Sequence, residues 1–283
     1  MTSASPGREP LEQSGVGDPP VWLAPTGGRA ASAPRWWLEL VYVVVFYVLY
    51  SAVRNLQGSA SVSTHRAFED ARMVIGLEER LHVFVEHGAQ RLALHFVPAI
   101  DVANMFYGTA HFVVTIGALV WLFRHHPPRY RRWRTTLAAT TAVALIGFAS
   151  FPVLPPRLLP AHYGFVDTLA RYKTIWSFDS GTMHSVSNQF AAMPSLHFAW
   201  ALWVALALVP VLRHRWARAL AAAYPLVTAL VVIVTANHYL SDLAGGVGAL
   251  AAGVLGSWLV SRLTSRHCRE HEPRPGVVGR TPR

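Results

Sequence analysis

The sequence predicts an all-α, polytopic membrane protein: a bundle of six transmembrane helices with an extracytoplasmic amphipathic helical segment. Hydrophobic residues make up 52% of the chain and charged residues only 14%, whereas ordinary soluble domains carry roughly 25% charged residues. Several apolar runs approach the ~20 residues needed to cross a bilayer. The net charge of +10 is spread over short loops between these runs. This distribution excludes a nucleic-acid-binding face and is typical of the positive-inside pattern of membrane proteins.

The N-terminal residues 1–34 are rich in Pro, Gly, Ser and Ala and show no hydrophobic periodicity. We therefore expect a disordered cytoplasmic tail there, followed by a six-span membrane domain over residues 35–264. The first span covers about residues 36–56, with Trp36 and Trp37 at the membrane interface. Because no small-residue cleavage site follows this span, we expect it to remain in the protein as a signal anchor.

The segment between the first span and Val97 is too polar to cross a membrane. Apolar residues recur in it at helical spacing, at Leu77, Leu81, Phe84, Val85, Leu92 and Phe96. Charged residues lie elsewhere on the helical wheel, at Glu78, Glu79, Arg80, Glu86 and Arg91. This pattern predicts one or two amphipathic helices on the membrane surface, with a break near Gly76.

The second span, about residues 98–123, carries polar side chains on one face. They are Asp101, Asn104, Tyr107 and His111, at spacings that place them on the same side of a helix. Polar groups inside a membrane usually face the interior of the helix bundle and mark a functional cavity. The alternative is a hydrogen-bonded packing stripe between helices.

The four remaining spans are expected at about residues 135–154, 194–212, 219–236 and 240–263. Prolines end the first of these four, a basic loop precedes it over residues 124–134, and a polar loop follows it over residues 158–192. The last span contains glycines that permit close helix approach, at Gly245, Gly246, Gly248, Gly253 and Gly256. Residues 265–283 are predicted to form a basic cytoplasmic tail.

The distribution of basic residues predicts which side of the membrane each loop faces. Six spans put both termini on one side, and that side carries 17 Lys and Arg residues against eight on the other. The positive-inside rule then places both termini of this multi-pass cell-membrane protein in the cytoplasm. The candidate functional residues all fall at the opposite, extracytoplasmic face: Arg157, Ser195, His197, His238 and Asp242.

The stretch Ala191–His197 reads Ala-Ala-Met-Pro-Ser-Leu-His, at the point where a polar loop meets the fourth span. Pro194 suits the first turn of a helix, because its missing N–H would have no helical partner there. Ser195 and Leu196 would then offer free backbone N–H groups at a positive helix end, where an anion can bind. With His197 as a proton donor or acceptor, the stretch predicts a phosphate-sized anion site. A helix start with an incidental histidine is the alternative.

His238 and Asp242 are four residues apart, so their side chains touch if the last helix begins near His238. A carboxylate that accepts a hydrogen bond from one imidazole nitrogen leaves the other nitrogen free to act as a nucleophile. Arg157 supplies a charged, planar fork of donors for phosphate oxygens. Because His197 can protonate a departing oxygen, these residues together suit phosphoryl transfer through a phosphohistidine.

Other readings of the same residues stay open. The sequence shows no cluster of Asp and Glu that would bind magnesium, so we expect metal-independent chemistry without a cofactor. His197, His238 and Asp242 could instead form a metal site, and Ser195 with His238 could form a dyad for intramembrane proteolysis. The non-enzymatic alternative is a transporter or lipid-binding scaffold with a degenerate site, although the paired broken helices of many transporters are missing.

Over about residues 145–256 the chain resembles the type 2 phosphatidic acid phosphatase superfamily. It is most similar to the branch of inositol phosphorylceramide synthase. Three segments carry the resemblance: Pro155-Pro156-Arg157, Pro194-Ser195-Leu196-His197 and His238-Tyr239-Leu240-Ser241-Asp242. The resemblance implies a six-helix bundle with its site near the outer leaflet. It also implies these roles: phosphate binding by Arg157 and Ser195, general acid by His197, nucleophile by His238 and orientation of that nucleophile by Asp242.

The resemblance implies an integral membrane phosphatase or phosphotransferase that acts on a lipid phosphate or phospholipid, with a lipid alcohol as an acceptor in the synthase-like branch. Two departures from the phosphatase branch remove cations. Ser150 stands where that branch has Lys, and Val231 and Val232 stand where it has a Ser-Arg pair. Lys173 and Arg171 are candidate replacements for a missing cation. Additional candidate site residues are Asp101, Asn188 and Tyr239.

Overall fold

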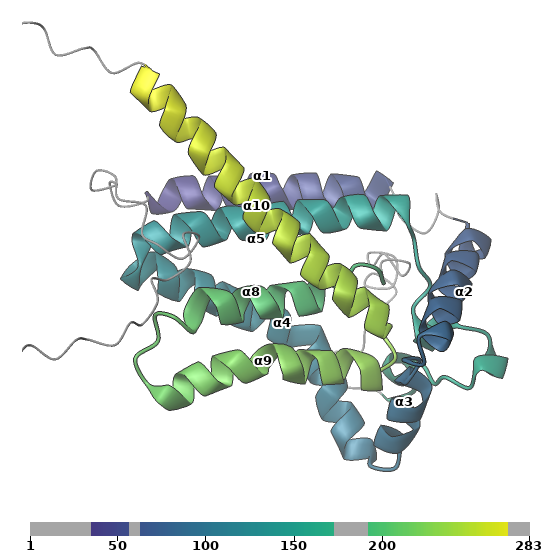
Figure 1. Cartoon of the computed structure of the whole chain (residues 1–283). Helices are drawn as coiled ribbons and strands as arrows, with labels where there is room; N and C mark the ends of the chain where they lie inside the picture. Colours follow the sequence, from purple (N-terminus) through teal and green to yellow (C-terminus); the bar gives the residue numbers. More distant parts are fainter. Residues whose placement is uncertain (1–34, 57–62, 173–191, 271–283) are drawn as a thin grey trace, which may run out of the picture. The chain divides into compact units, whose positions relative to one another are not determined.

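The computed structural model describes residues 35–56, 63–172 and 192–270 (Figure 1). This part of the chain is all-helical and contains no β-strand, as the composition predicts. Its elements are α1 (Trp36–Leu56), α2 (Thr64–Arg80), α3 (Glu86–Leu94), α4 (Val97–His125), α5 (Pro127–Ser150), η1 (Pro156–Leu158), η2 (Ala161–Tyr163), α6 (Thr168–Arg171), α8 (Leu196–Leu208), α9 (Arg215–Val234) and α10 (Leu240–Glu270). The N-terminal tail predicted for residues 1–34, Lys173, Asn188 and residues 271–283 lie outside the described residues.

Among the described helices, three are long and apolar enough to cross a membrane: α4, α9 and the Leu240–Leu263 part of α10. The apolar stretches Trp36–Val45 in α1 and Leu196–Leu208 in α8 are shorter. α8 has 13 residues, which at 1.5 Å per residue extend about 20 Å, less than the ~30 Å hydrocarbon core of a bilayer. These lengths support a membrane protein, and the full set of six spans stays a prediction.

Several predicted helix boundaries differ from the observed ones. α1 has the predicted bounds, but α5 begins at Pro127 rather than at Thr135, so the predicted basic loop is mostly helical. Two consecutive prolines start this helix, because proline lacks only an N–H that the first turn leaves unpaired. At the other end of the chain, α10 continues to Glu270, so the predicted boundary at residue 264 lies inside this helix.

The amphipathic segment forms two helices, and its break lies between Arg80 and Glu86 rather than at Gly76, which is inside α2. His82 in this connection has a φ of 56°, in the left-handed region that reverses a helical chain. Most apolar residues predicted for the membrane-facing side are exposed in the structure, namely Leu77, Leu81, Val85, Leu92 and Phe96. The opposite face of α2 is the one buried against the protein.

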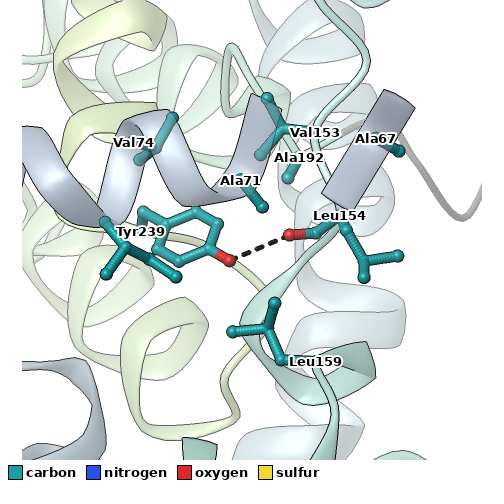
Figure 2. Packing of buried hydrophobic residues seen from close by; sticks show 9 residues of the cluster. Ala67, Ala71, Val74, Val153, Leu154, Leu159, Ala192 and Tyr239 are labelled. Atoms are coloured by element: carbon teal, nitrogen blue, oxygen red, sulfur yellow. Dashed lines mark hydrogen bonds between the residues drawn. The ribbon is translucent and has the colours of Figure 1, made fainter. Parts of the chain in front are cut away.

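This buried face of α2 packs on the loop that follows α5 and on the residues that precede α10. Its cluster contains Ala67, Ala71, Val74, Ile75, Val153, Leu154, Leu159, Ala192 and Tyr239. Figure 2 shows the Tyr239 ring beside α2, with its hydroxyl directed at the Leu154 carbonyl, to which it donates a 3.0 Å hydrogen bond. The small Ala67 and Ala71 side chains allow α2 to approach these residues closely. The amphipathic helix therefore stabilises both loops.

α10 has its most extensive contacts with α5, and small residues bring the two helices together. A Cβ atom on Gly253 would collide with Thr140, so the glycine is required for this approach. Thr136 Oγ1 donates a 2.9 Å hydrogen bond to Ser257 Oγ across the same contact. Gly248, by contrast, has nothing within 4 Å of its added Cβ atom. Close approach therefore depends on some of the predicted glycines and not on all five.

Candidate active site

The loop between α9 and α10 carries His238 and has an unusual backbone. Ala236 has a φ of 54°, a left-handed conformation that residues other than glycine adopt infrequently. Its carbonyl accepts a 2.9 Å hydrogen bond from the Arg157 N–H, which ties this loop to η1. The N–H groups of Asn237 and His238 both donate to the Val232 carbonyl, at 3.0 and 3.2 Å. These bonds hold the loop in one conformation despite the strain at Ala236.

His238 and Asp242 are in contact, although α10 begins at Leu240 rather than at His238. His238 Nδ1 lies 3.2 Å from Asp242 Oδ2. The same oxygen accepts a 2.8 Å hydrogen bond from the Tyr239 N–H, which fixes the carboxylate. His238 is 3% exposed and Asp242 is fully buried. In the described part of the chain, His238 Nε2 has no hydrogen-bond partner, so this nitrogen is the one free to react.

Ser195 is the N-cap of α8, and this arrangement corrects two predictions. Its hydroxyl accepts a 3.4 Å hydrogen bond from the Phe198 N–H, so Pro194 lies before the helix rather than in its first turn. The Ser195 N–H is also not free, because it donates a 2.9 Å hydrogen bond to the Asp242 carbonyl. The free N–H groups at this helix end therefore begin with Leu196, the first helical residue.

Glycines in the first turns of α10 allow this direct bond between Ser195 and Asp242. A Cβ atom on Gly246 would lie 2.7 Å from the Ser195 carbonyl oxygen, and one on Gly245 would lie 3.1 Å from Pro194 Cβ. Gly147 of α5 makes room for the same proline, whose Cδ would lie 2.6 Å from an added Cβ. The second motif thus sits against the third because all three positions lack a side chain.

We expect Gly246→Ala to destabilise the protein by ~1–3 kcal/mol, because the backbone at Ser195 would have to move. Gly248→Ala is the matched control on the same helix, since its Cβ would meet nothing within 4 Å. This control should be neutral or stabilising by up to about 1 kcal/mol. Thermal unfolding of the two variants in detergent measures the difference, and equal transition temperatures would contradict the close approach.

Arg157 lies in η1, directly after the prolines that follow α5. Its Nε donates a 3.0 Å hydrogen bond to Asn237 Oδ1, and its Nη1 donates a 2.9 Å bond to Asp167 Oδ2. Asp167 is itself fixed as the N-cap of α6, where it accepts hydrogen bonds from Leu169 and Ala170. The two bonds hold the guanidinium plane beside the residue that precedes His238, and they leave its other N–H groups available to an anion.

His197 stands among aromatic side chains in the first turn of α8. Its ring stacks on Tyr107, with centroids 4.3 Å apart, and meets the His111 ring edge-on at 4.2 Å. The His238 ring centroid is 5.9 Å away. His197 and His238 are thus neighbours, which brings the second and third motifs together. The polar face predicted for α4 reaches this cluster through Tyr107 and His111.

The remaining sequence candidates lie in different surroundings. Asn104 exchanges two 3.0 Å hydrogen bonds with Thr168, which favours a packing role for that end of the polar stripe. Asp101 is half-buried and has no hydrogen-bond or ion-pair partner within the described residues. Tyr239 is fully buried, and its contacts with Leu154 and Asp242 support the loop rather than a substrate.

The positions where the phosphatase branch has cations hold none here. Ser150 ends α5, and its hydroxyl donates to the Ile146 carbonyl of the same helix. Val231 and Val232 are buried packing residues of α9. Lys173, one of the two predicted replacements, lies outside the described residues, while the other, Arg171, is exposed.

The two alternative uses of these residues do not match the geometry. Within the described ranges, no group of three or more His, Cys, Asp and Glu side chains is arranged to hold a metal ion, so His197, His238 and Asp242 do not form the predicted three-ligand site. Ser195 Oγ is bonded to the Phe198 N–H and not to His238 Nε2, so the Ser195–His238 dyad is not formed either.

Four polar residues of this region were missed by sequence reasoning. Asn237 and Asp167 bond Arg157, while Glu78 and Glu86 accept hydrogen bonds from the N-terminus of α10. Asn237 precedes His238 and could have been found from its place in the motif. Asp167 lies 10 residues after Arg157, in the polar loop, whereas Glu78 and Glu86 lie 163 and 154 residues from the α10 residues that they bond. No spacing or repeat signals any of these three contacts.

Comparison with protein-family models identifies a family for this chain. The family model of the PAP2 superfamily, the type 2 phosphatidic acid phosphatases, matches residues 72–256. The matched range contains the five main candidate residues: Arg157, Ser195, His197, His238 and Asp242. No curated protein and no solved structure matches the chain.

Proposed function

The chain belongs to the PAP2 superfamily, and from this membership we propose that it is an integral membrane phosphatase or phosphotransferase that acts on a lipid phosphate or phospholipid. The observation that carries the proposal concerns the buried His238 ring. Its Nε2 has no hydrogen-bond partner among the described residues, and its Nδ1 contacts the Asp242 carboxylate. A neutral imidazole held in this way is a nucleophile. The long apolar helices α4, α9 and α10 agree with a lipid substrate.

In the proposed reaction, His238 Nε2 attacks the phosphorus atom of the substrate. A P–N bond forms and the P–O bond to the leaving group breaks, while His197 donates a proton to the departing oxygen. Arg157 and the N-terminus of α8, capped by Ser195, bind the phosphate oxygens and stabilise their charge in the transition state. Asp242 keeps the His238 tautomer and balances the charge of the phosphohistidine.

Two outcomes are open to the phosphoenzyme. Attack by water releases inorganic phosphate, whereas attack by a lipid alcohol gives a new phosphate ester. In the second case a phospho-head group transferred from a phospholipid would yield a phosphodiester. The two cations missing at Ser150 and at the Val231–Val232 pair favour the synthase-like branch, because a phosphodiester carries less negative charge than a phosphomonoester.

We further propose six membrane spans, with both termini in the cytoplasm and the site at the extracytoplasmic face. Loop charge supports this topology, since 17 of the 25 Lys and Arg residues would lie on the cytoplasmic side. The site geometry agrees with it, because Arg157 follows the end of α5 while Ser195 and His238 precede α8 and α10. A single face of a bundle collects these three helix ends when neighbouring helices are antiparallel.

Product release from a panel of lipid phosphates and phospholipids tests this function. The assay uses detergent-purified protein with a chelator, with and without an added lipid alcohol, and His238→Ala as the blank. Inorganic phosphate without the alcohol indicates a phosphatase, and a phosphodiester formed only with the alcohol indicates a transferase. Binding of these lipids or their transport into vesicles, with no product above the blank, would favour the non-catalytic alternative.

Arg157→Lys should lower kcat/KM by roughly 10- to 100-fold, because lysine lacks the planar fork of donors. Arginine can keep its bonds to Asn237 and Asp167 and still present N–H groups to phosphate, whereas a single ammonium cannot do all three. Arg72→Lys is the control, since Arg72 is an exposed residue of α2 that pairs with Glu69. Equal kcat/KM values for Arg157→Lys and wild type would remove Arg157 from the phosphate site.

A further inference from the structure

Two glutamates outside the three motifs hold the N-terminus of α10. Glu86 Oε1, from α3, accepts a 2.7 Å hydrogen bond from the Leu240 N–H. Glu78 Oε1, from α2, accepts 2.6 Å hydrogen bonds from both the N–H and the hydroxyl of Ser241. The first N–H groups of a helix have no helical acceptor and carry its positive end, so carboxylates from a separate segment cap this helix.

Both glutamates are fully buried, and each has an unused oxygen. Their side chains are 0% exposed, although glutamate is almost never fully buried unless it is paired. Oε2 of Glu78 and Oε2 of Glu86 have no hydrogen-bond partner among the described residues. Their Oε1 atoms are bonded to consecutive backbone N–H groups, so the two carboxyl groups lie next to each other.

Two adjacent buried carboxylates resist carrying two negative charges. Like charges in one desolvated site favour a single proton held between the groups, because that proton removes their repulsion. Burial raises the pKa of Glu86 from its ordinary 4.5 to about 7, and the neighbouring Glu78 charge adds to this increase, while the hydrogen bond from the Leu240 N–H opposes it. Near neutral pH the pair therefore carries a proton that is close to being lost.

The groups around the pair come from several elements. Glu78 faces Glu86 from α2, and the Tyr239 hydroxyl, the Asp242 carboxylate and the Tyr163 hydroxyl are the other titratable neighbours of this cluster. α3 also packs against α4 and α9, whose described titratable side chains do not contribute to the pKa of Glu86. The charge around the start of α10 therefore depends on the Glu78–Glu86 pair and on the Asp242 carboxylate that contacts His238.

We propose that Glu78 and Glu86 are positioning residues for the His238–Asp242 contact, holding the first turn of α10 through a carboxyl pair that shares one proton. The residues they bond, Leu240 and Ser241, lie between Tyr239, whose N–H holds the Asp242 carboxylate, and Asp242 itself. A shift of this turn would change the angle at which Asp242 meets His238. This role rests on the function proposed above, although the shared proton does not.

The expected pH dependence of stability follows from the direction in which the pKa of Glu86 is shifted. A carboxyl group with a pKa raised in the folded state stabilises the protein fully below its unfolded pKa, and this contribution is lost as the pH rises through the folded value. For Glu86 this loss runs from about pH 4.5, its ordinary pKa, to about pH 7, where the folded protein gives up the proton. Above that pH the two carboxylates repel each other, so the first turn of α10 should loosen and kcat should fall.

Infrared spectroscopy of the purified wild-type protein tests the shared proton without any assay of activity. A buried carboxylic acid gives a carbonyl band distinct from that of a carboxylate, and the band should disappear as the pH rises through about 7. Glu86→Gln should abolish this transition, and Glu78→Gln should move it to lower pH, because the neighbouring charge that adds to the increase in the pKa of Glu86 is removed. Glu79→Gln changes an exposed glutamate of α2, the helix that carries Glu78. This control should keep the transition. A wild-type spectrum with no such transition, or one unchanged in both pair variants, would overturn the proposal.

The pH profile of kcat tests the positioning role. Glu86→Gln should move the alkaline decline of kcat upward by about one pH unit or more, with KM little changed, because glutamine cannot ionise. Glu86→Ala should lower kcat at every pH, since the acceptor for Leu240 is lost, and Glu79→Gln should follow wild type. An unchanged alkaline decline in Glu86→Gln would contradict the role. If the wild-type protein turns over no substrate, the proposed function fails. The infrared transition still tests whether Glu78 and Glu86 share a proton.

Discussion

His238→Ala is expected to lower turnover at least ~10⁴-fold, because the side chain that would form the bond to phosphorus is removed. The other groups around the site would remain, and they would bind the substrate without a nucleophile. KM should therefore change little. His238 is buried, and its Nε2 has no partner in the part of the chain that the structure describes. Its removal also takes away a desolvated polar atom, so the folded protein should persist. Product formation and thermal unfolding in detergent measure the two properties.

His65→Ala is the matched control for this experiment. His65 lies in the first turn of α2 and is exposed, so its replacement should change neither turnover nor the unfolding temperature. If His238→Ala kept more than about a tenth of wild-type turnover, the assignment of His238 as the nucleophile would be wrong.

Asp242→Asn is expected to lower kcat by roughly 10³- to 10⁴-fold, although asparagine has nearly the same shape. The carboxylate Oδ2 contacts His238 Nδ1 and accepts the Tyr239 N–H. The amide oxygen of asparagine can replace Oδ2 in both contacts, but asparagine carries no negative charge to balance the charge that develops on the His238 ring when Nε2 bonds to phosphorus. The phosphohistidine should therefore form more slowly, so the loss should appear in kcat rather than in KM.

A double variant separates this explanation from simple misfolding. If Asp242 acts through His238, the His238→Ala/Asp242→Asn protein should be no less active than His238→Ala alone. Glu69→Gln, at an exposed carboxylate of α2, serves as the control for loss of a negative charge. Additive losses in the double variant would show that Asp242 contributes independently of His238.

The parts of the fold that the sequence predicted are those governed by local patterns. Apolar runs predict α4, α9 and α10 well, because a membrane span is a property of a single segment. The bounds of α1 were also predicted. The start of α5 differs from the prediction because a run of arginines is typical of a loop between spans, whereas the prolines at its first positions are compatible with a helix start.

The parts of the site that could not be predicted depend on contacts between distant segments. Spacing alone indicates the contact of His238 with Asp242, since the two residues are four apart, and the contact forms although His238 precedes α10. Nothing local indicates that Glu78 and Glu86 meet the start of α10, because 163 and 154 residues separate each from its partner. The free Ser195 N–H was likewise a local expectation that the tertiary bond to Asp242 overrides.

The most direct test of the central claim is to trap the phosphoenzyme. Protein incubated briefly with a substrate labelled at phosphorus is denatured, and the bound label is tested for the acid-labile, alkali-stable behaviour of phosphohistidine. We expect one label on wild type, none on His238→Ala, and rapid loss of the label when excess unlabelled substrate, with or without a lipid alcohol acceptor, is added as a chase. Turnover by wild type with no labelled protein at any time, or a label that persists in His238→Ala, would contradict the phosphohistidine mechanism at His238.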